Sequence, residues 1–177
     1  MLKLPVNQVT VSLNEVPDKV ACVVELGGCL SACKGCHSPN LQGTFTKPKM
    51  SLSELEEIVD NQIEKGCDAI CVMGGDCSCE ITLDELKTVV NTLATIAPVC
   101  LYSSNPNAEP FEEMQLKWLK VGPYIESKGG LETPGTNQML LEITRSNRVD
   151  IIDTFHHEVT EELAYKDITN KLQKRWY

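Results

Sequence analysis

Long hydrophobic runs, aromatic residues and positive charge are all scarce in this chain of 177 residues. No apolar run approaches the roughly 18 residues that a membrane-spanning helix needs. Aromatic side chains make up 5% of the chain, which disfavours a stacking platform for single-stranded nucleic acid. The formal net charge is -9, so the surface should repel phosphate backbones and anionic lipid. We therefore expect neither nucleic-acid nor membrane binding.

The sequence also lacks a recognisable export signal, but it is rich in cysteine. Residues 1–5 show no charged start followed by an apolar segment, so we expect a cytoplasmic protein. The chain holds 9 cysteines, an odd number, and a reducing compartment disfavours disulfides. Catalytic thiols, metal ligands or small buried residues remain as their roles.

No internal repeat, low-complexity tract or long Pro/Gly/Ser linker divides the chain, which predicts a single domain over residues 1–177. Strand-like and helix-like segments alternate along it. We expect strands at 20–26, 69–73, 98–102, 120–126, 138–144 and 149–155, and helices at 52–64, 83–96, 110–119 and 158–172. This alternation predicts an α/β fold with a mostly parallel sheet. A complete α/β barrel needs about 200 residues or more, so an open doubly wound sheet or an incomplete barrel remains.

Three cysteines follow the strand predicted at 20–26 in a C-x3-C-x2-C pattern: Cys29, Cys33 and Cys36. Neighbouring glycines allow a loop tight enough for three sulfurs to converge. Three thiolates with no obvious fourth predict a [4Fe–4S] cluster with one iron left open to a ligand.

Two other metal sites remain as alternatives. Structural zinc takes four ligands at similar spacing, but a second C-x2-C pair is absent and His37 directly adjoins Cys36. An electron-transfer cluster would also need a fourth thiolate.

Two further strand ends carry candidate binding residues. Gly74 and Gly75 end the strand predicted at 69–73 and allow close backbone approach, and Asp76 can accept a charge-assisted hydrogen bond from an ammonium group. An ordinary strand-ending turn is the alternative. Ser103, after the third strand, either lines a cofactor pocket or begins a loop.

Four stretches, at residues 28–40, 73–76, 121–126 and 136–138, together resemble the radical S-adenosylmethionine (SAM) superfamily. The first is specific for the superfamily. The last two are similar to the activating proteins of anaerobic ribonucleoside-triphosphate reductases, which are glycyl-radical-activating enzymes. The similarity runs from about residue 20 to residue 145.

The resemblance implies that Cys29, Cys33 and Cys36 hold the cluster, that SAM chelates the open iron, and that Gly74–Asp76 bind SAM. His37 would contact adenine, because Gly35 stands where the superfamily usually has an aromatic residue. Reductive cleavage of SAM would generate a radical that takes a hydrogen atom from a glycine of the reductase large subunit. Reduced flavodoxin or ferredoxin would supply the electron. An incomplete (partial) TIM-type barrel suits this task, since a loop of a large protein must enter the site.

Rival functions remain open at this point. The chain could activate a different glycyl radical enzyme, or act as a carboxydeazaguanine synthase. Outside enzymes, an iron–sulfur electron carrier or a zinc-stabilised interaction module would also use clustered cysteines. Among the other cysteines, Cys22, Cys71 and Cys100 are expected to be small buried residues, and Cys67, Cys77 and Cys79 have no assigned role.

Overall fold

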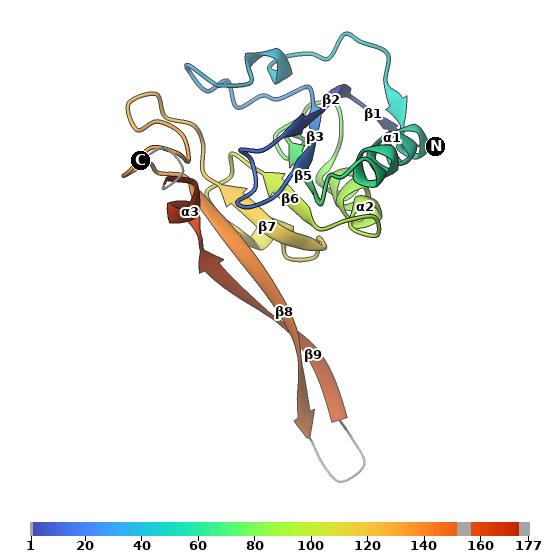
Figure 1. Ribbon diagram of the computed structural model, residues 1–177, viewed down its shortest axis with the longest axis vertical. Coiled ribbons are helices and arrows are strands. Elements are labelled where there is room, and N and C mark those ends of the chain that lie inside the picture. The colour runs from blue at the N-terminus through green and yellow to red at the C-terminus, as the bar shows by residue number, and fades with distance from the viewer. Residues whose placement is uncertain (1, 152–156, 174–177) are drawn as a thin grey trace.

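The computed structural model describes residues 2–151 and 157–173, with side chains for 2–147 and 159–173. Its main feature is a seven-stranded sheet in the order β2-β3-β5-β6-β7-β8-β9 (Figure 1). The strands are β2 (Val6–Ser12), β3 (Ala21–Leu26), β5 (Ala69–Met73), β6 (Val99–Tyr102), β7 (Leu116–Val121), β8 (Met139–Ile151) and β9 (His157–Asp167). A second, two-stranded sheet pairs β1 (Lys3–Leu4) with β4 (Met50–Ser51).

The four central strands, β3, β5, β6 and β7, run parallel, and β2, β8 and β9 join antiparallel. Their spatial order follows the chain order without the reversal that defines a doubly wound sheet. The α/β class with a mostly parallel central sheet is therefore confirmed. The incomplete barrel stays a prediction.

Both long helices pack on the same face of the sheet. Leu55 and Val59 of α1 (Leu52–Glu64) join one apolar cluster with Leu86 and Val90 of α2 (Leu83–Leu93). On the opposite face a smaller cluster of mostly short side chains packs against α3 (Thr169–Gln173). The two long helices thus cover the central strands on one face, and the other face is left with room for a cavity.

Local capping explains why two helix starts were predicted correctly. The Ser51 hydroxyl accepts a hydrogen bond from the Glu54 amide, and the Glu54 carboxylate accepts one from the Ser51 amide at 2.7 Å. Thr82 and Glu85 form the same reciprocal pair at the start of α2. Helix α1 matches its predicted range 52–64, whereas α2 ends at Leu93, before the predicted end at 96.

The helix predicted at 110–119 is wrong. This segment contains a short 3-10 turn, η2 (Glu109–Phe111), followed by strand β7. Five of the six residues of β7 are buried, because the strand lies inside the sheet and both of its faces are covered. A strand buried on both faces loses the alternation that identifies strands in a sequence. The strand predicted at 120–126 shares only its first two residues with β7.

The helix predicted at 158–172 is also wrong. Most of it forms strand β9, which pairs antiparallel with β8 along its whole length, and only 169–173 is helical. Apolar residues at 159 and 163 fit a helical spacing, but the same positions lie on one face of a strand, and tertiary pairing decides between them. The strand predicted at 138–144 is confirmed as part of β8. Of the strand predicted at 149–155, residues 149–151 belong to β8 and 152–155 lie outside the described residues.

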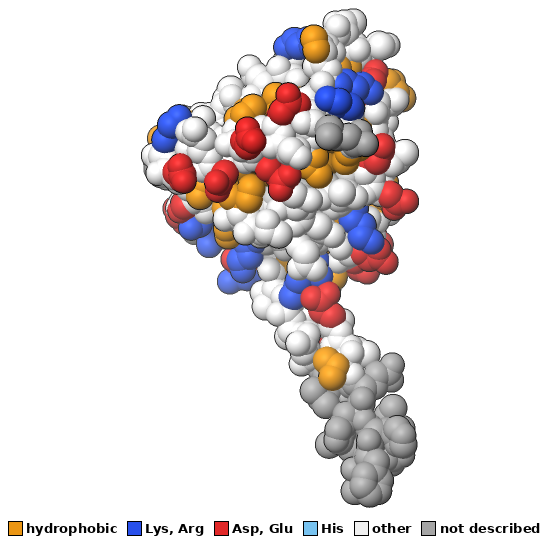
Figure 2. Space-filling view, turned by 90° about the vertical axis from the view of Figure 1, so that its right-hand side faces the viewer, with side chains coloured by type: hydrophobic (Ala, Val, Ile, Leu, Met, Phe, Trp, Pro, Cys, Tyr) orange, Lys and Arg blue, Asp and Glu red, His pale blue; other side chains and the backbone are white. Residues whose placement is uncertain are grey.

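The paired β8 and β9 extend as a long arm away from the body of the molecule (Figures 1 and 2). Among the described residues, no helix combines the length and hydropathy required to cross a bilayer.

Removing the α1 cap should cost measurable stability. We expect Ser51→Ala to lower the free energy of unfolding by about 1 kcal/mol, because the Glu54 amide loses its acceptor and the Glu54 carboxylate loses the hydroxyl donor, although it keeps the bond from the backbone amide of residue 51. Denaturant unfolding followed by circular dichroism measures this. Ser53→Ala, an exposed position in the first turn of the same helix, is the matched control and should change stability by only a few tenths of a kcal/mol. Equal losses in both variants would contradict the role of the cap.

Candidate functional site

The carboxyl ends of the four parallel strands meet at one edge of the sheet, and every predicted site residue follows one of these ends. The cysteine loop follows β3, Gly74–Asp76 follow β5, and Ser103 follows β6. In parallel sheets this edge is where binding sites form. The structure therefore brings together three loops that are far apart in the sequence.

The cysteine loop is anchored at its first ligand. The Cys29 amide donates to the Leu41 carbonyl at 2.8 Å, and the Cys29 carbonyl accepts from the Gly43 amide at 3.0 Å. Further along, the Cys33 carbonyl accepts from the Cys36 amide at 3.2 Å and from the Gln42 side-chain amide at 3.2 Å. These bonds fold residues 29–43 into a closed loop that carries all three cysteines.

Gly35 occupies a backbone conformation that disfavours any larger residue. Its φ is +72°, and an added Cβ would lie 3.2 Å from the Glu126 carboxylate. Lys34 forms an ion pair with the same carboxylate at 2.9 Å. The fold thus explains why this chain has no aromatic residue just before the third cysteine.

The three thiols are free, and each is partly buried. The Cys36 sulfur accepts a hydrogen bond from the Ser38 amide at 3.4 Å, the kind of contact that stabilises a thiolate. Within the part of the chain that the structure describes, no three His, Cys, Asp or Glu side chains are arranged to hold a single metal ion. The chemistry of the donor set nevertheless fits a thiolate-bound cluster, since three unpaired sulfurs lie on one loop.

The loop after β5 joins two of the predicted binding residues. Gly74 has a φ of +83°, and an added Cβ would lie 2.6 Å from the Leu26 carbonyl, so only glycine fits against β3. The turn through Gly75 directs Asp76 toward the loop after β6. There the Asp76 carboxylate accepts a hydrogen bond of 2.6 Å from the hydroxyl of Ser103, which is 1% exposed.

A second group of contacts ties the cysteine loop to both neighbouring loops. The hydroxyls of Ser31 and Ser104 lie 2.7 Å apart, and the Cys77 sulfur lies 3.1 Å from Ser104. The Leu30 amide donates to the Cys77 carbonyl at 2.9 Å. Burial raises the pKa of the Cys77 thiol. Cys77, whose role the sequence left open, thus belongs to the network that holds the three loops together.

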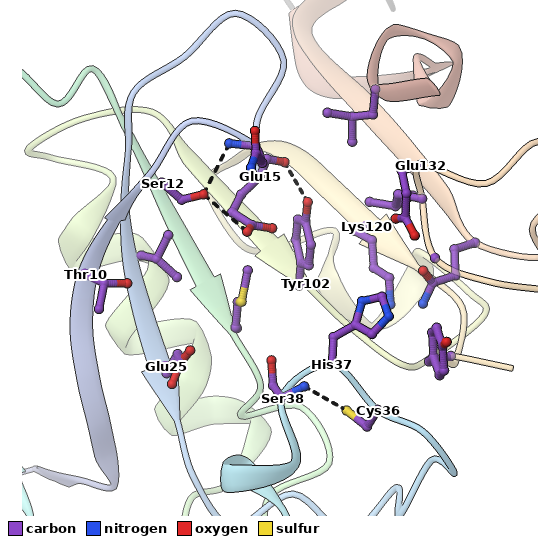
Figure 3. A pocket seen from close by; sticks show the side chains of 18 of the residues that line it. Thr10, Ser12, Glu15, Glu25, Cys36, His37, Ser38, Tyr102, Lys120 and Glu132 are labelled. Atoms are coloured by element: carbon purple, nitrogen blue, oxygen red, sulfur yellow. Dashed lines mark hydrogen bonds between the residues drawn. The ribbon is translucent and has the colours of Figure 1, made fainter. Parts of the chain in front are cut away.

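A cavity of about 650 Å³ opens beside these loops, on the sheet face opposite α1 and α2 (Figure 3). Its floor includes a row of residues that pair across the four parallel strands, namely Glu25, Met73, Tyr102 and Lys120. Of the predicted site residues, only Cys36 and His37 line it. The lining does not include Cys29, Cys33, Gly74, Gly75, Asp76 or Ser103.

Lys120 was missed by the sequence interpretation. Its side chain is 8% exposed, and its ammonium group donates to the carbonyls of Ser103 at 3.1 Å and Gly122 at 2.7 Å. Burial lowers the pKa of Lys120 to about 8, an effect that the negative charges of Asp76 and of the cysteine loop partly oppose. The sequence did hold a signal for this residue: Lys120 lies in a segment, 116–121, whose other residues are mostly apolar.

An aromatic pair stands at the mouth of the cavity near the cysteines. The rings of His37 and Tyr124 have centroids 4.8 Å apart and are tilted by 49°. Both residues line the cavity, and Tyr124 comes from the loop after β7. The two rings offer a surface against which a flat heterocycle can stack.

Acidic side chains also line the cavity, among them Glu15, Glu25 and Glu132. Glu25 is buried and accepts hydrogen bonds from the side-chain amides of Asn7 at 3.0 Å and Asn40 at 3.1 Å. Burial raises the pKa of Glu15, and the nearby charges of Glu132 and Glu25 add to this effect. The cavity thus combines several acidic groups with a buried cation and two aromatic rings.

Residues 19–120 match the family model described as a 4Fe-4S single cluster domain. The matched segment begins just before β3, includes the whole cysteine loop and ends at Lys120. No curated protein and no solved structure matches the chain. The family match supports iron–sulfur binding by this domain.

The burial of Lys120 predicts a pH-dependent contribution to stability. Its pKa in the folded state, about 8, lies below the unfolded value of 10.5, so the unfolded chain binds more protons between these two pH values. Stability should therefore rise with pH in this window. Relative to Lys120→Met, the wild-type protein should gain roughly 3 kcal/mol between pH 7 and pH 10.5.

Denaturant unfolding at both pH values measures this difference, and contributions of the cysteine thiols cancel between the two proteins. Lys117→Met, on the same strand but half-exposed, serves as the control and should show no such gain. A difference that stays constant with pH would show that Lys120 titrates normally.

Proposed function

The chain belongs to the family of 4Fe-4S single cluster domains, and from this premise we propose that it is a radical SAM enzyme. We infer that it reductively cleaves SAM to generate a glycyl radical on an anaerobic ribonucleoside-triphosphate reductase. One observation carries the proposal. A loop with three free cysteines borders a cavity of about 650 Å³, a volume typical of sites for small molecules and cofactors.

In this proposal Cys29, Cys33 and Cys36 each hold one iron of the cluster, and SAM binds the fourth. The bound cluster and SAM supply one-electron chemistry that removes a hydrogen atom from a glycine. The chain's own contribution is to place and shield these groups. The hydrogen bonds of the cysteine loop to Leu41 and Gln42 fix where the cluster would stand relative to the cavity.

Charges on the cavity wall match the two ends of the amino-acid part of SAM. The Lys120 ammonium group presents a positive charge for a carboxylate, and its position is set by the Ser103 and Gly122 carbonyls. Glu25 presents a negative charge for an ammonium or sulfonium group and is oriented by Asn7 and Asn40. His37 and Tyr124 provide rings for adenine.

The resemblance also assigns Gly74, Gly75 and Asp76 to SAM, and this stays a prediction. Their contacts support a positioning role as well, because Gly74 allows close packing on Leu26 and Asp76 holds Ser103. Ser103 in turn provides a carbonyl to Lys120 at 3.1 Å. Asp76 is thereby linked through Ser103 to the cation that lines the cavity.

The open side of the cavity suits a macromolecular substrate. No helix among the described residues other than the short α3 packs on this face, so a loop of the reductase large subunit could reach the cavity. We propose this subunit as the partner, with reduced flavodoxin or ferredoxin as the electron donor. Neither partnership follows from the family match alone.

Electron paramagnetic resonance on reduced, anaerobically reconstituted protein tests the function. We expect the signal of a reduced [4Fe–4S] cluster that changes shape when SAM is added, and a glycyl radical doublet when the reductase is added. Cys33→Ala should lose the cluster, because a ligand is removed. Cys79→Ala is the matched control, since this exposed cysteine lies outside the motif, and it should keep the signal.

If the signal of the cluster did not change when SAM is added, the proposal would be wrong, and an electron-carrier function would be favoured instead. A colourless protein that retains zinc would point to a structural metal site.

Lys120 offers a separate test of the SAM site. We expect Lys120→Met to weaken SAM binding about tenfold or more, because a charge-assisted contact to the carboxylate is lost, with iron content unchanged. A titration of the cluster signal with SAM measures the affinity. The control variant Lys117→Met should bind SAM with the affinity of the wild type. If Lys120→Met also bound SAM with unaltered affinity, Lys120 would not be part of the SAM site.

A further inference from the structure

The loop between β7 and β8, residues 122–138, forms a wall of the cavity that the proposed SAM site leaves mostly unused. The stretches 121–126 and 136–138 stand at its two ends. Only one of its lining residues, Tyr124, has a role in binding SAM in the proposed function. The others are Gly130, Leu131, Glu132 and Gln138, and they are available to a second molecule in the cavity.

The two ends of this loop are locked together. Gly122 has a φ of +98°, and an added Cβ would lie 3.0 Å from the Asn137 backbone carbonyl, so glycine is strongly favoured there. The Asn137 side-chain amide donates to the Pro123 carbonyl at 2.8 Å. The Thr136 hydroxyl accepts a hydrogen bond from the Gln138 backbone amide at 3.2 Å. These contacts fix the backbone at residue 138, directly before β8.

The side chain of Gln138 faces the cavity. Gln138 is 6% exposed, lines the cavity, and lies two residues before Leu140, which packs on the same face of the sheet. Its side-chain nitrogen donates to the Gly122 carbonyl at 3.3 Å, and this carbonyl also accepts from Lys120 at 2.7 Å. Within the part of the chain that the structure describes, the Gln138 side-chain carbonyl accepts no hydrogen bond. Its side chain therefore holds an unpaired polar atom in a largely buried position.

Gln138 offers a ligand one acceptor, one donor and no charge. Its side-chain carbonyl and its second N–H are both available. The carboxylate of SAM needs donors and its ammonium group needs acceptors, and Lys120 and Glu25 meet these needs in the proposed site. A peptide unit, by contrast, presents one carbonyl acceptor and one N–H donor. The hydrogen-bonding pattern of Gln138 thus matches a main chain and not the charged ends of SAM.

Apolar neighbours in the lining strengthen this preference. Leu131 and Leu172 line the same cavity, and both are buried in the apolar cluster that contains Leu140. A polar atom left without a partner in such surroundings is costly. A ligand that pairs with both free groups of Gln138 removes this cost, so the contact provides specificity as well as affinity.

We propose that Gln138 binds the main chain of the polypeptide loop that carries the target glycine. The inference rests on the proposed function and names how its substrate is held. A glycine has no side chain that a protein can grip, so the groups next to its α-carbon that can be bound are the two flanking peptide units. Pairing with one of these units fixes the α-carbon in the cavity. Gln138 holds the substrate and takes no part in the hydrogen transfer itself.

Gln138→Met tests the contact, because methionine is unbranched and of similar size but replaces the amide. The initial rate of glycyl radical formation is measured by electron paramagnetic resonance, at a reductase concentration well below saturation. We expect a loss of rate of about tenfold, as for two neutral hydrogen bonds. SAM affinity, from the titration of the cluster signal, should equal that of the wild type.

Gln173→Met is the matched control. The Gln173 side-chain amide also donates to a carbonyl of the same loop, that of Thr133 at 3.2 Å, but Gln173 does not line the cavity. This variant should form the glycyl radical at the rate of the wild type. Iron content and circular dichroism show that each variant is folded and loaded. If Gln138→Met does not fold, Gln138→Leu replaces it, with the same expected results.

The SAM titration separates substrate binding from a structural role. Gln138 and Lys120 share the Gly122 carbonyl, so a role in placing Lys120, or a contact with SAM itself, would lower the SAM affinity of Gln138→Met. That result would overturn the proposal, and so would an unaltered rate of radical formation. A wild-type cluster that does not respond to SAM is a different outcome, which contradicts the proposed function and this inference with it.

Discussion

The parallel register of β3, β5, β6 and β7 is the constraint on which the candidate site depends. It aligns Glu25, Met73, Tyr102 and Lys120 in one row across four strands, on the face that the long helices leave free. A shift of one residue in any strand would turn its side chain to the helix-covered face. The acid, the cation and the cavity floor therefore exist only because these four strands keep this register.

The loops that follow those strands are held to one another by side chains as well as by backbone. Asp76 binds Ser103, and Ser104 lies between Cys77 and Ser31 of the cysteine loop. Each of these contacts joins loops that leave neighbouring strands. Such mutual support matters for an iron–sulfur domain, because cluster ligation requires three sulfurs at a fixed position, and loops alone are the most mobile parts of a fold.

Buried charge distinguishes the cavity from an ordinary gap in packing. Lys120 retains its ammonium group at 8% exposure because two carbonyls accept from it, and burial still lowers its pKa to about 8. Glu25 is buried with two amide donors. Burying ionisable groups is costly, and the sites where proteins do so are commonly sites of binding or catalysis. This pattern agrees with a polar, zwitterionic ligand such as SAM.

The sequence alone determined the α/β class, the start of both long helices, the three buried strands β3, β5 and β6, and the cysteine loop with its iron–sulfur chemistry. These features depend on local signals, namely capping pairs, short apolar runs and ligand spacing. Only the tertiary structure decided that 116–121 and 157–167 are strands, that Lys120 and Glu25 share a cavity with Cys36, and that β9 is the last strand of the sheet in the described part of the chain. Those depend on which strands pair and in what register, and contacts between distant residues leave no periodic trace in the chain.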